Sequence, residues 1–559
     1  MFTMDSLVFL AIAVAILFAA VQRGGDGART MSEKTHRAIC GAAIAAGVLV
    51  RLARLTSLPA GISAEEALVG VQAKALWQTG GFLFGQGLTT QLSQWAGETT
   101  GPLLAVMTAP FVGLFGMSRL TVRLPLALLS CAAMPAAYGL GEALSGRRAA
   151  RWMLLIAALC PIFVLEARMT CGSCAALYLL PIALCLIARG VTKPAALYPG
   201  MIVLALTAYA QDMYFFIAPA AILACAIIAL IFGRRKRHAA LSGAIGLLLC
   251  VPAMLTAFVN LTGAESMTLL GLIRIPRLEG FEKAFMAENW SVGDKLWAVL
   301  IGGVFQVLRH ENIHQAMYTP DGMLALFMFS LPLMVLGTLA LFARWTDGCR
   351  VTGEKAAARA MVAATCAVTL AALVMFGSVG TLNTNGTTGL FDHSALILFD
   401  AVLMTAGLCT IERKNLRCAA AMGALMAVNF AWLAVQLFGG SYQANANVYF
   451  PGFEQMAARA AEIQAETGEK INVTGNVYPH IQPSDGAEMM FLYATDADMR
   501  TAEAEAERGT RYETIYVSDD MQPEADQIYL ARADEISNWD LEGFDYEESE
   551  GYALIYPAR

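Results

Sequence analysis

The stretch YFFIAPAAILACAIIALIF (Tyr214–Phe232) is followed by the basic run Arg234-Arg235-Lys236-Arg237 and then by a second apolar stretch, AALSGAIGLLLCVPAMLTAFV (239–259). Each apolar stretch has about the 20 residues that a helix needs to cross a bilayer core. A cluster of Lys and Arg between two such stretches is typical of a cytoplasmic connection, because basic loops are retained on that side. This region therefore predicts two membrane-spanning helices joined in the cytoplasm.

The composition of the whole chain agrees with this reading. Of 559 residues, 57% are hydrophobic and 15% are charged, and the mean hydropathy is +0.55. A soluble domain has about 45–50% apolar and about 25% charged residues. These values exclude a soluble enzyme, a disordered protein and a nucleic-acid binder with a basic surface. The chain is predicted to be a polytopic α-helical membrane protein, multi-pass in the plasma membrane, with no nucleic-acid partner.

Similar apolar segments recur along the chain, several of them shorter than the ideal length. We expect about twelve spans, at about 7–21, 38–55, 121–144, 150–165, 175–188, 195–210, 214–232, 239–259, 323–342, 360–376, 395–411 and 419–438. The basic connections, at 23–37, 147–151, 189–193, 234–237, 344–359 and 412–417, then all fall on one side, which is predicted to be cytoplasmic. This holds if 102–115 does not cross but forms a short helix at the outer surface.

Charge divides the chain into parts. The net charge of −7 combines a tail from Ser441, with 24 acidic and 7 basic residues, and a basic remainder. We predict an N-terminal anchor and cytoplasmic loop (1–37), a transmembrane domain (38–439) with long outer loops 56–120 and 260–322, and an extracytoplasmic domain (440–559). Helix 453–467 and strands at 470–474, 514–518 and 552–556 predict a small α/β fold in the tail. All 12 cysteines precede the tail and predict no disulfide framework.

The first outer loop contains the clearest candidates for chemistry. Ser63 is a suitable helix N-cap, and Glu65 and Glu66 then lie in the first turn, where the helix dipole favours carboxylates. Capping alone accounts for such acids. A carboxylate held just above the bilayer is also suited to act as a general base. Adjacent helical residues point about 100° apart, so one of the two acids can face a given site.

Other polar side chains gather at the outer ends of the spans. Arg168 ends the fourth span, where it either reaches the interface or binds a lipid phosphate through its planar fork of donors. Asp212 is the one acid in the tight connection between Tyr209 and Tyr214. The loop before the eleventh span, which includes Asn383, Asn385 and His393, is read either as a capped loop or as a polar lid over a ligand.

Taken together, these motifs resemble the GT-C-fold glycosyltransferases, and within them the glycosyltransferase family 39-like group of protein O-mannosyltransferases and lipid A aminoarabinose transferases. The resemblance rests on short motifs spread over nearly the whole chain: Pro59-x-Gly61, Glu65-Glu66, GPLLAVMTAPFVGLFG (101–116) before Arg123-Leu-Pro, Pro161…Ala167-Arg168, Ala208-Tyr209…Tyr214, Ile273-Arg274-Ile-Pro276-Arg277 and Asn383-x-Asn385. It implies transfer of a sugar from a polyprenyl-phosphate donor to a hydroxyl of a protein or glycan, or to a lipid phosphate, at the outer membrane face, with inversion.

The resemblance also implies roles for individual residues. Glu65 is expected to act as the base, with support from Glu66, and Arg168 to contact the carrier phosphate. Arg274 and Arg277 are reserve cations, and the remaining substrate-binding candidates are Tyr209, Asp212, Asn383, Asn385 and His393. No zinc-type spacing or phosphate-binding glycine loop is found, so no metal ligand is predicted, although a divalent metal remains possible. Two alternatives stay open: a transporter or flippase, and a catalytically inactive GT-C-like scaffold.

Overall fold

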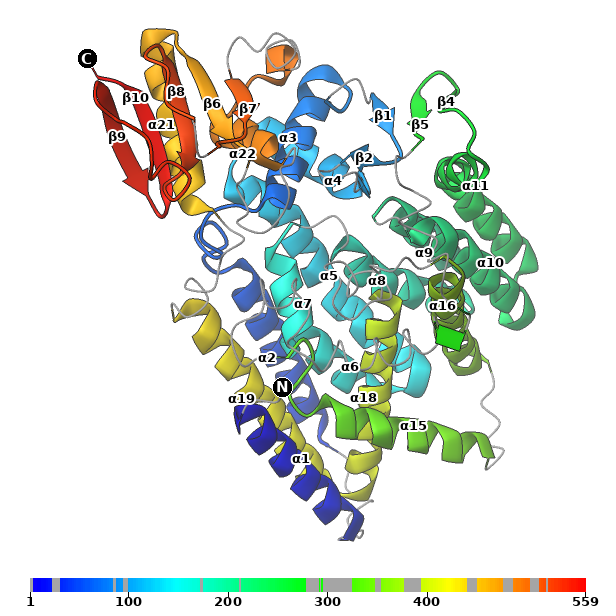
Figure 1. The fold of residues 1–559 in the computed structure, drawn as a ribbon. Helices are drawn as coiled ribbons and strands as arrows, with labels where there is room; N and C mark the ends of the chain where they lie inside the picture. Colours follow the sequence, from blue (N-terminus) through cyan, green and yellow to red (C-terminus); the bar gives the residue numbers. More distant parts are fainter. Residues whose placement is uncertain are drawn as a thin grey trace.

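The computed structural model describes residues 4–22, 31–83, 87–93, 99–170, 174–210, 213–277, 291, 293–294, 324–346, 353–376, 394–439, 450–475, 486–502, 512–518 and 521–558. A large bundle of helices carries a smaller α/β unit at one end (Figure 1). This architecture confirms the predicted polytopic helical membrane protein with a C-terminal α/β region. The predicted boundary at residue 440 lies outside the described residues.

Twelve helices cover most of the twelve predicted spans, and the span predicted at 150–165 is broken after Leu159. They are α1 (Met4–Gln22), α2 (Glu33–Leu52), α5 (Arg119–Ser145), α6 (Arg147–Leu159), α8 (Cys174–Gly190), α9 (Leu197–Leu206), α10 (Tyr214–Phe232), α11 (Lys236–Thr262), α15 (Ser330–Thr346), α16 (Glu354–Phe376), α18 (Ser394–Lys414) and α19 (Leu416–Phe438). Apolar runs near 20 residues give helices because, in lipid, every backbone polar group must be bonded within its own segment.

The helices differ in whether they can cross a membrane unaided. Among the described residues, seven are long and apolar enough, or eight if the bent pair formed by α6 and α7 (Pro161–Leu165) with η2 (Glu166–Arg168) is one span. That pair bends by 60° at Pro161, which has no N–H to continue the helical ladder. Helices α1, α8, α9 and α15 are apolar but shorter.

The segment predicted as the first outer loop forms helices α3 (Ala64–Thr79) and α4 (Leu103–Phe115) and small sheets. Helix α4, with 13 residues, is about 20 Å long and too short to span, in agreement with the short helix predicted at 102–115. Strand β2 (Leu92–Ser93) pairs with β3 (Thr99–Thr100). Strand β1 (Leu88–Thr89) pairs with β5 (Ile273–Ile275), which also pairs with β4 (Met267–Leu269). The two segments predicted as outer loops are thereby joined by backbone hydrogen bonds.

The C-terminal unit is a five-stranded mixed sheet with two helices. Its elements are α21 (Pro451–Thr467), β6 (Lys470–Thr474), α22 (Gly486–Ala494), β7 (Tyr512–Ile515), β8 (Gln527–Arg532), β9 (Phe544–Ser549) and β10 (Tyr552–Pro557). The strand order is β7-β6-β8-β10-β9, with β6 parallel to both of its neighbours and β10 antiparallel to both of its own. The helix and three strands predicted from the sequence are present, with ends that differ by at most three residues. The sequence analysis did not anticipate α22, β8 and β9.

Helix α3 lies between the bundle and the C-terminal unit (Figure 1). Most of its side chains between residues 64 and 75 are buried, and they share one apolar cluster with α21, α22 and the sheet. The residues in this cluster include Leu68 and Val71 of α3 and Phe453, Met490 and Phe491 of the C-terminal unit. The helix that carries the predicted base is thus held from both sides.

Candidate functional site

The N-terminus of α3 has the predicted capping geometry. Ser63 is extended, and its hydroxyl accepts a hydrogen bond from the Glu66 N–H at 3.2 Å. The Ser63 N–H in turn donates to the Glu66 carboxylate, and the two bonds form a capping box. Glu65 is the second residue after the cap and is partly exposed, although its Oε2 atom is buried, whereas Glu66 is 1% exposed. The 100° offset between neighbouring helical positions therefore gives the two acids different surroundings.

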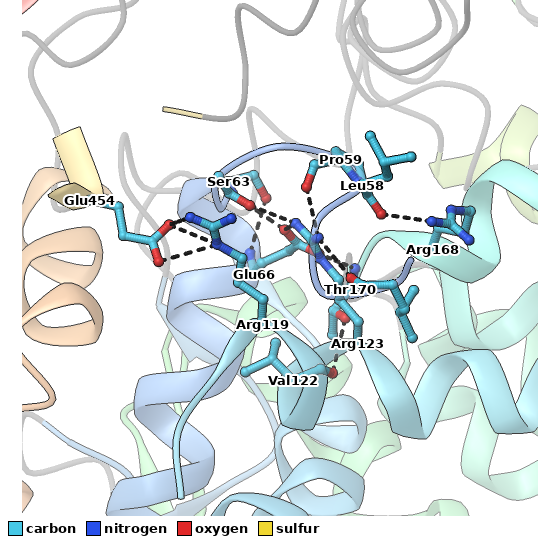
Figure 2. A network of polar contacts seen from close by, with 12 residues as sticks. Leu58, Pro59, Ser63, Glu66, Arg119, Val122, Arg123, Arg168, Thr170 and Glu454 are labelled. Atoms are coloured by element: carbon cyan, nitrogen blue, oxygen red, sulfur yellow. Dashed lines mark hydrogen bonds and ion pairs between the residues drawn. The ribbon is translucent and has the colours of Figure 1, made fainter. Parts of the chain in front are cut away.

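The carboxylate of Glu66 is occupied by internal partners. The Arg123 guanidinium binds it through two hydrogen bonds of 2.8 Å, and the Thr170 N–H donates to it at 3.1 Å (Figure 2). The remaining Arg123 donors bond to the carbonyls of Leu55, Pro59 and Gly61. A buried pair with nearly all of its donors and acceptors used fixes geometry, so Glu66 holds the 55–66 segment against α5.

Arg168 is also buried and faces backbone. Its guanidinium donates to the carbonyls of Val50 at 2.6 Å and Leu58 at 2.8 Å, and its side chain is 1% exposed. These carbonyls belong to the last turn of α2 and the loop after it, where a cation satisfies acceptors that lack helical partners. The phosphate contact expected for Arg168 stays a prediction, and it requires the guanidinium to leave these carbonyls.

A second buried arginine, on α2, donates hydrogen bonds to the broken span that carries Arg168. Arg51, near the end of α2, donates to the carbonyls of Ala157 and Phe163, each at 2.7 Å. These carbonyls flank the bend between α6 and α7, which leaves acceptors without helical partners. Helix α2 thus caps the broken span through Arg51, and the broken span caps α2 through Arg168. The sequence analysis did not identify Arg51, although an Arg inside an apolar run is itself a signal of a buried contact.

Glu166 was likewise missed. It is 6% exposed and accepts a hydrogen bond from the Cys174 thiol at 2.9 Å, and the Glu65 carboxyl lies near enough to affect its ionisation. The signal in the sequence was an acid within the apolar run PIFVLEAR (161–168). The structure therefore brings two carboxyl groups together below the α3 N-terminus, one from the outer loop and one from the end of a broken span.

The C-terminal unit closes over this region through polar contacts. Arg119 of α5 binds Glu454 of α21, with Nη2 to Oε2 at 2.7 Å (Figure 2), and Lys74 of α3 binds Asp496 at 2.6 Å. Burial, together with the charges of Glu454 and Glu66, raises the pKa of the Tyr493 phenol above its ordinary value. Tyr493 therefore stays neutral in the interface between α22 and α3.

The structure places the other predicted residues apart from this cluster or leaves them undescribed. Tyr209 is in the 3-10 turn η4 (Thr207–Tyr209), and its hydroxyl donates to the Leu249 carbonyl at 2.6 Å. Arg274 in β5 and Arg277 after it are exposed. Four candidates lie outside the described residues: Asp212, Asn383, Asn385 and His393. Among the described residues, no group of three His, Cys, Asp or Glu side chains is arranged to hold a metal ion.

No protein-family model and no curated protein matches the chain. Among solved structures, it is similar to the oligosaccharyltransferase of Archaeoglobus fulgidus in the apo form, with 11% identity over 83% of this chain and a TM-score of 0.46. The chain spans 64% of that protein's length. It is also similar to the same organism's AglB in complex with an inhibitory peptide and a dolichol-phosphate, with 11% identity, a TM-score of 0.46, and coverage of 94% of this chain and 74% of that one.

A further similar structure is ArnT from Cupriavidus metallidurans bound to undecaprenyl phosphate, with 12% identity and a TM-score of 0.47, covering 94% of this chain and 98% of that one. The similarities concern the fold alone.

Proposed function

We propose that the protein is a membrane glycosyltransferase that moves a sugar from a polyprenyl-phosphate donor to an acceptor hydroxyl, or to a lipid phosphate, at the outer membrane face. The observation that carries the proposal is the contrast within Glu65-Glu66: Glu66 is buried in a network with Arg123, whereas the adjacent Glu65 is partly exposed beside Glu166. A fixed helix cap that holds one partly exposed acid is suited to position a general base.

Glu65 would accept the proton of the attacking hydroxyl, and the donor phosphate would leave with the carrier lipid. Positive charge is needed where that phosphate departs. Arg168 is engaged by carbonyls, while Arg274 and Arg277 are exposed on the outer-loop sheet that β1 and β5 build. We therefore assign the phosphate contact to Arg274 and Arg277 ahead of Arg168.

The orientation and partners are part of the same proposal. The C-terminal unit, which packs on α3, would be extracytoplasmic, since the basic connections define the opposite face. The acceptor would be a protein, a glycan or a lipid. A divalent metal stays part of the proposal as a candidate cofactor, since the A. fulgidus oligosaccharyltransferase has also been solved with zinc and sulfate.

The test is sugar transfer in nanodiscs that contain radiolabelled polyprenyl-phosphate sugars, with carrier release measured in parallel. Glu65→Gln keeps the size of the side chain and removes its basicity, and we expect a loss of about 100-fold or more. Glu265→Gln, which alters an exposed acid in the second outer loop, is the matched control and should retain the wild-type rate. Full activity of Glu65→Gln would exclude the assigned base, and absence of carrier binding by the wild type would favour the transporter or the scaffold.

A further inference from the structure

A cavity of about 1060 Å³ opens at the end of the bundle opposite α3. It is formed by the last turns of α5, the start of α6, the end of α8 with the residues after it, and the start of α16. Helix α5 runs between the two regions, and the 23 residues from Arg123 to Gly146 correspond to about 35 Å. The cavity is therefore separate from the candidate glycosyltransferase site.

The charge in the cavity is predominantly positive. Four basic side chains line it, Arg147, Arg189, Lys193 and Lys355, against two acids, Glu142 and Glu354. Arg147 also pairs with Glu33 of α2. None of the ion pairs found among the described residues involves the other three cations. These three cations are exposed at the cavity and can contact an anion bound there.

The walls of the cavity are fixed by helix packing. Arg189 lies along α5, since a Cβ added at Gly139 would be 2.6 Å from its Nη2. Arg359 of α16 donates to the Leu144 carbonyl and the Ser145 hydroxyl, each at 3.0 Å, and ties α16 to the end of α5. A ligand would therefore meet a preformed opening between helices.

The location indicates the chemistry of that ligand. The cavity lies at the ends of spans, where the headgroup region begins, on the face that the basic connections predict to be cytoplasmic. Guanidinium groups bind phosphate through paired donors, and ammonium groups add point charge. Basic pockets between membrane helices on this side are suited to anionic lipid headgroups.

We propose that this cavity, lined by Arg147, Arg189, Lys193 and Lys355, is a binding site for the phosphate of an anionic phospholipid headgroup from the inner leaflet. A soluble phosphate has the same chemistry, so the experiment must distinguish the two sources. The proposal is independent of the glycosyltransferase assignment.

The test uses the delipidated full-length protein in detergent, titrated with phosphatidylglycerol or with phosphatidylcholine of the same acyl chains, and native mass spectrometry to count bound lipids. We expect one phosphatidylglycerol bound at least tenfold more tightly than phosphatidylcholine. Arg189→Gln with Lys193→Gln should weaken it at least tenfold. The matched control, Arg234→Gln with Arg235→Gln, removes two charges from the basic run outside the cavity and should stay within twofold of wild type.

The charge-conserving exchange, Arg189→Lys with Lys193→Arg, should retain binding and so distinguishes loss of charge from loss of fold. Displacement of phosphatidylglycerol by millimolar inorganic phosphate would identify a soluble-phosphate site and overturn the lipid assignment. If both glutamine pairs weaken phosphatidylglycerol binding equally, the lipid is attracted by the general surface charge and not by this cavity. If the wild type binds phosphatidylglycerol and phosphatidylcholine equally, it has no site selective for anionic lipid. Either result would overturn the proposal.

Discussion

Two adjacent acids of one helical turn have different surroundings because of what reaches them from elsewhere in the chain. The cap at Ser63 and the placement of Glu65 and Glu66 in the first turn follow from local spacing, and the sequence predicts them correctly. The pairing of Glu66 with Arg123, 57 residues away, has no local signal. The same limit applies to Arg168, whose carbonyl partners come from a different span.

Removing one partner of the buried pair should destabilise the protein strongly. Arg123→Ala leaves the Glu66 carboxylate buried without its cation, and such losses cost about 3–5 kcal/mol. We expect a lower unfolding temperature in nanodiscs, together with faster hydrogen exchange of the backbone amides in the loop at 55–63. Replacing both members, Glu66→Gln with Arg123→Met, should cost less than Arg123→Ala alone. If all variants unfold at the wild-type temperature, the pair does not hold the loop.

Arg168 and Arg274 should separate into a structural and a binding role. Arg168→Gln removes donors to buried carbonyls and is expected to lower the unfolding temperature, because unsatisfied buried acceptors cost about 1–3 kcal/mol each. Arg274→Gln, at an exposed position, should leave stability unchanged and weaken binding of a polyprenyl phosphate. Thermal unfolding and carrier binding are measured on both variants. The reverse result would restore Arg168 as the phosphate contact.

Helix packing in the bundle depends on small residues at close crossings. Helix α15 crosses α18 (Figure 1), and a Cβ added at Gly337 would lie 2.0 Å from the Leu403 carbonyl oxygen, while one added at Gly407 would lie 2.3 Å from that of Leu333. Such reciprocal contacts let two backbones approach as in other membrane helix pairs. The crossing holds α15, one of the shorter apolar helices, against a full-length span.

The close crossing predicts that a Gly-to-Ala change lowers stability at the crossing but not at an open position on another helix. Gly337→Ala and Gly407→Ala must push α15 and α18 apart, so each should lower the unfolding temperature. Gly41→Ala in α2 has nothing within 4 Å of the added carbon and should be neutral or slightly stabilising, because Ala favours helix more than Gly does. Differential scanning fluorimetry of the three variants gives the comparison. Three equal shifts would mean that the crossing adds nothing beyond helix propensity.

The periodicity and length of apolar segments predicted the helices and strands that depend on nearby residues alone. The twelve apolar segments, the short α4 and strand β6 are where the sequence placed them. Strand β9, FDYEES, was missed because its many acids resemble a solvated loop, and it is a strand because β10 supplies hydrogen bonds along one edge. The bend at Pro161 was also missed, since an apolar run continues through it.

For the whole molecule, the main feature is that the C-terminal unit completes the core around α3. Reversing Arg119 to Glu, or Glu454 to Arg, should loosen this docking, because each single change places like charges at a contact of 2.7 Å. We expect faster hydrogen exchange in peptides that cover α3 (64–79) in both single variants. The double exchange should restore protection. Unaltered exchange in the single variants would show that apolar packing alone holds the interface.

That shared core has a consequence for biosynthesis. Lys74 meets Asp496 across a separation of 422 residues, and at about 5–20 residues per second a ribosome needs roughly 20–80 s to cover that length. During this interval, the face of α3 that is buried in the folded protein has been synthesised, while its covering strands and helices are still unmade. The nascent first loop therefore has to be shielded by lipid or by a chaperone until the last fifth of the chain arrives.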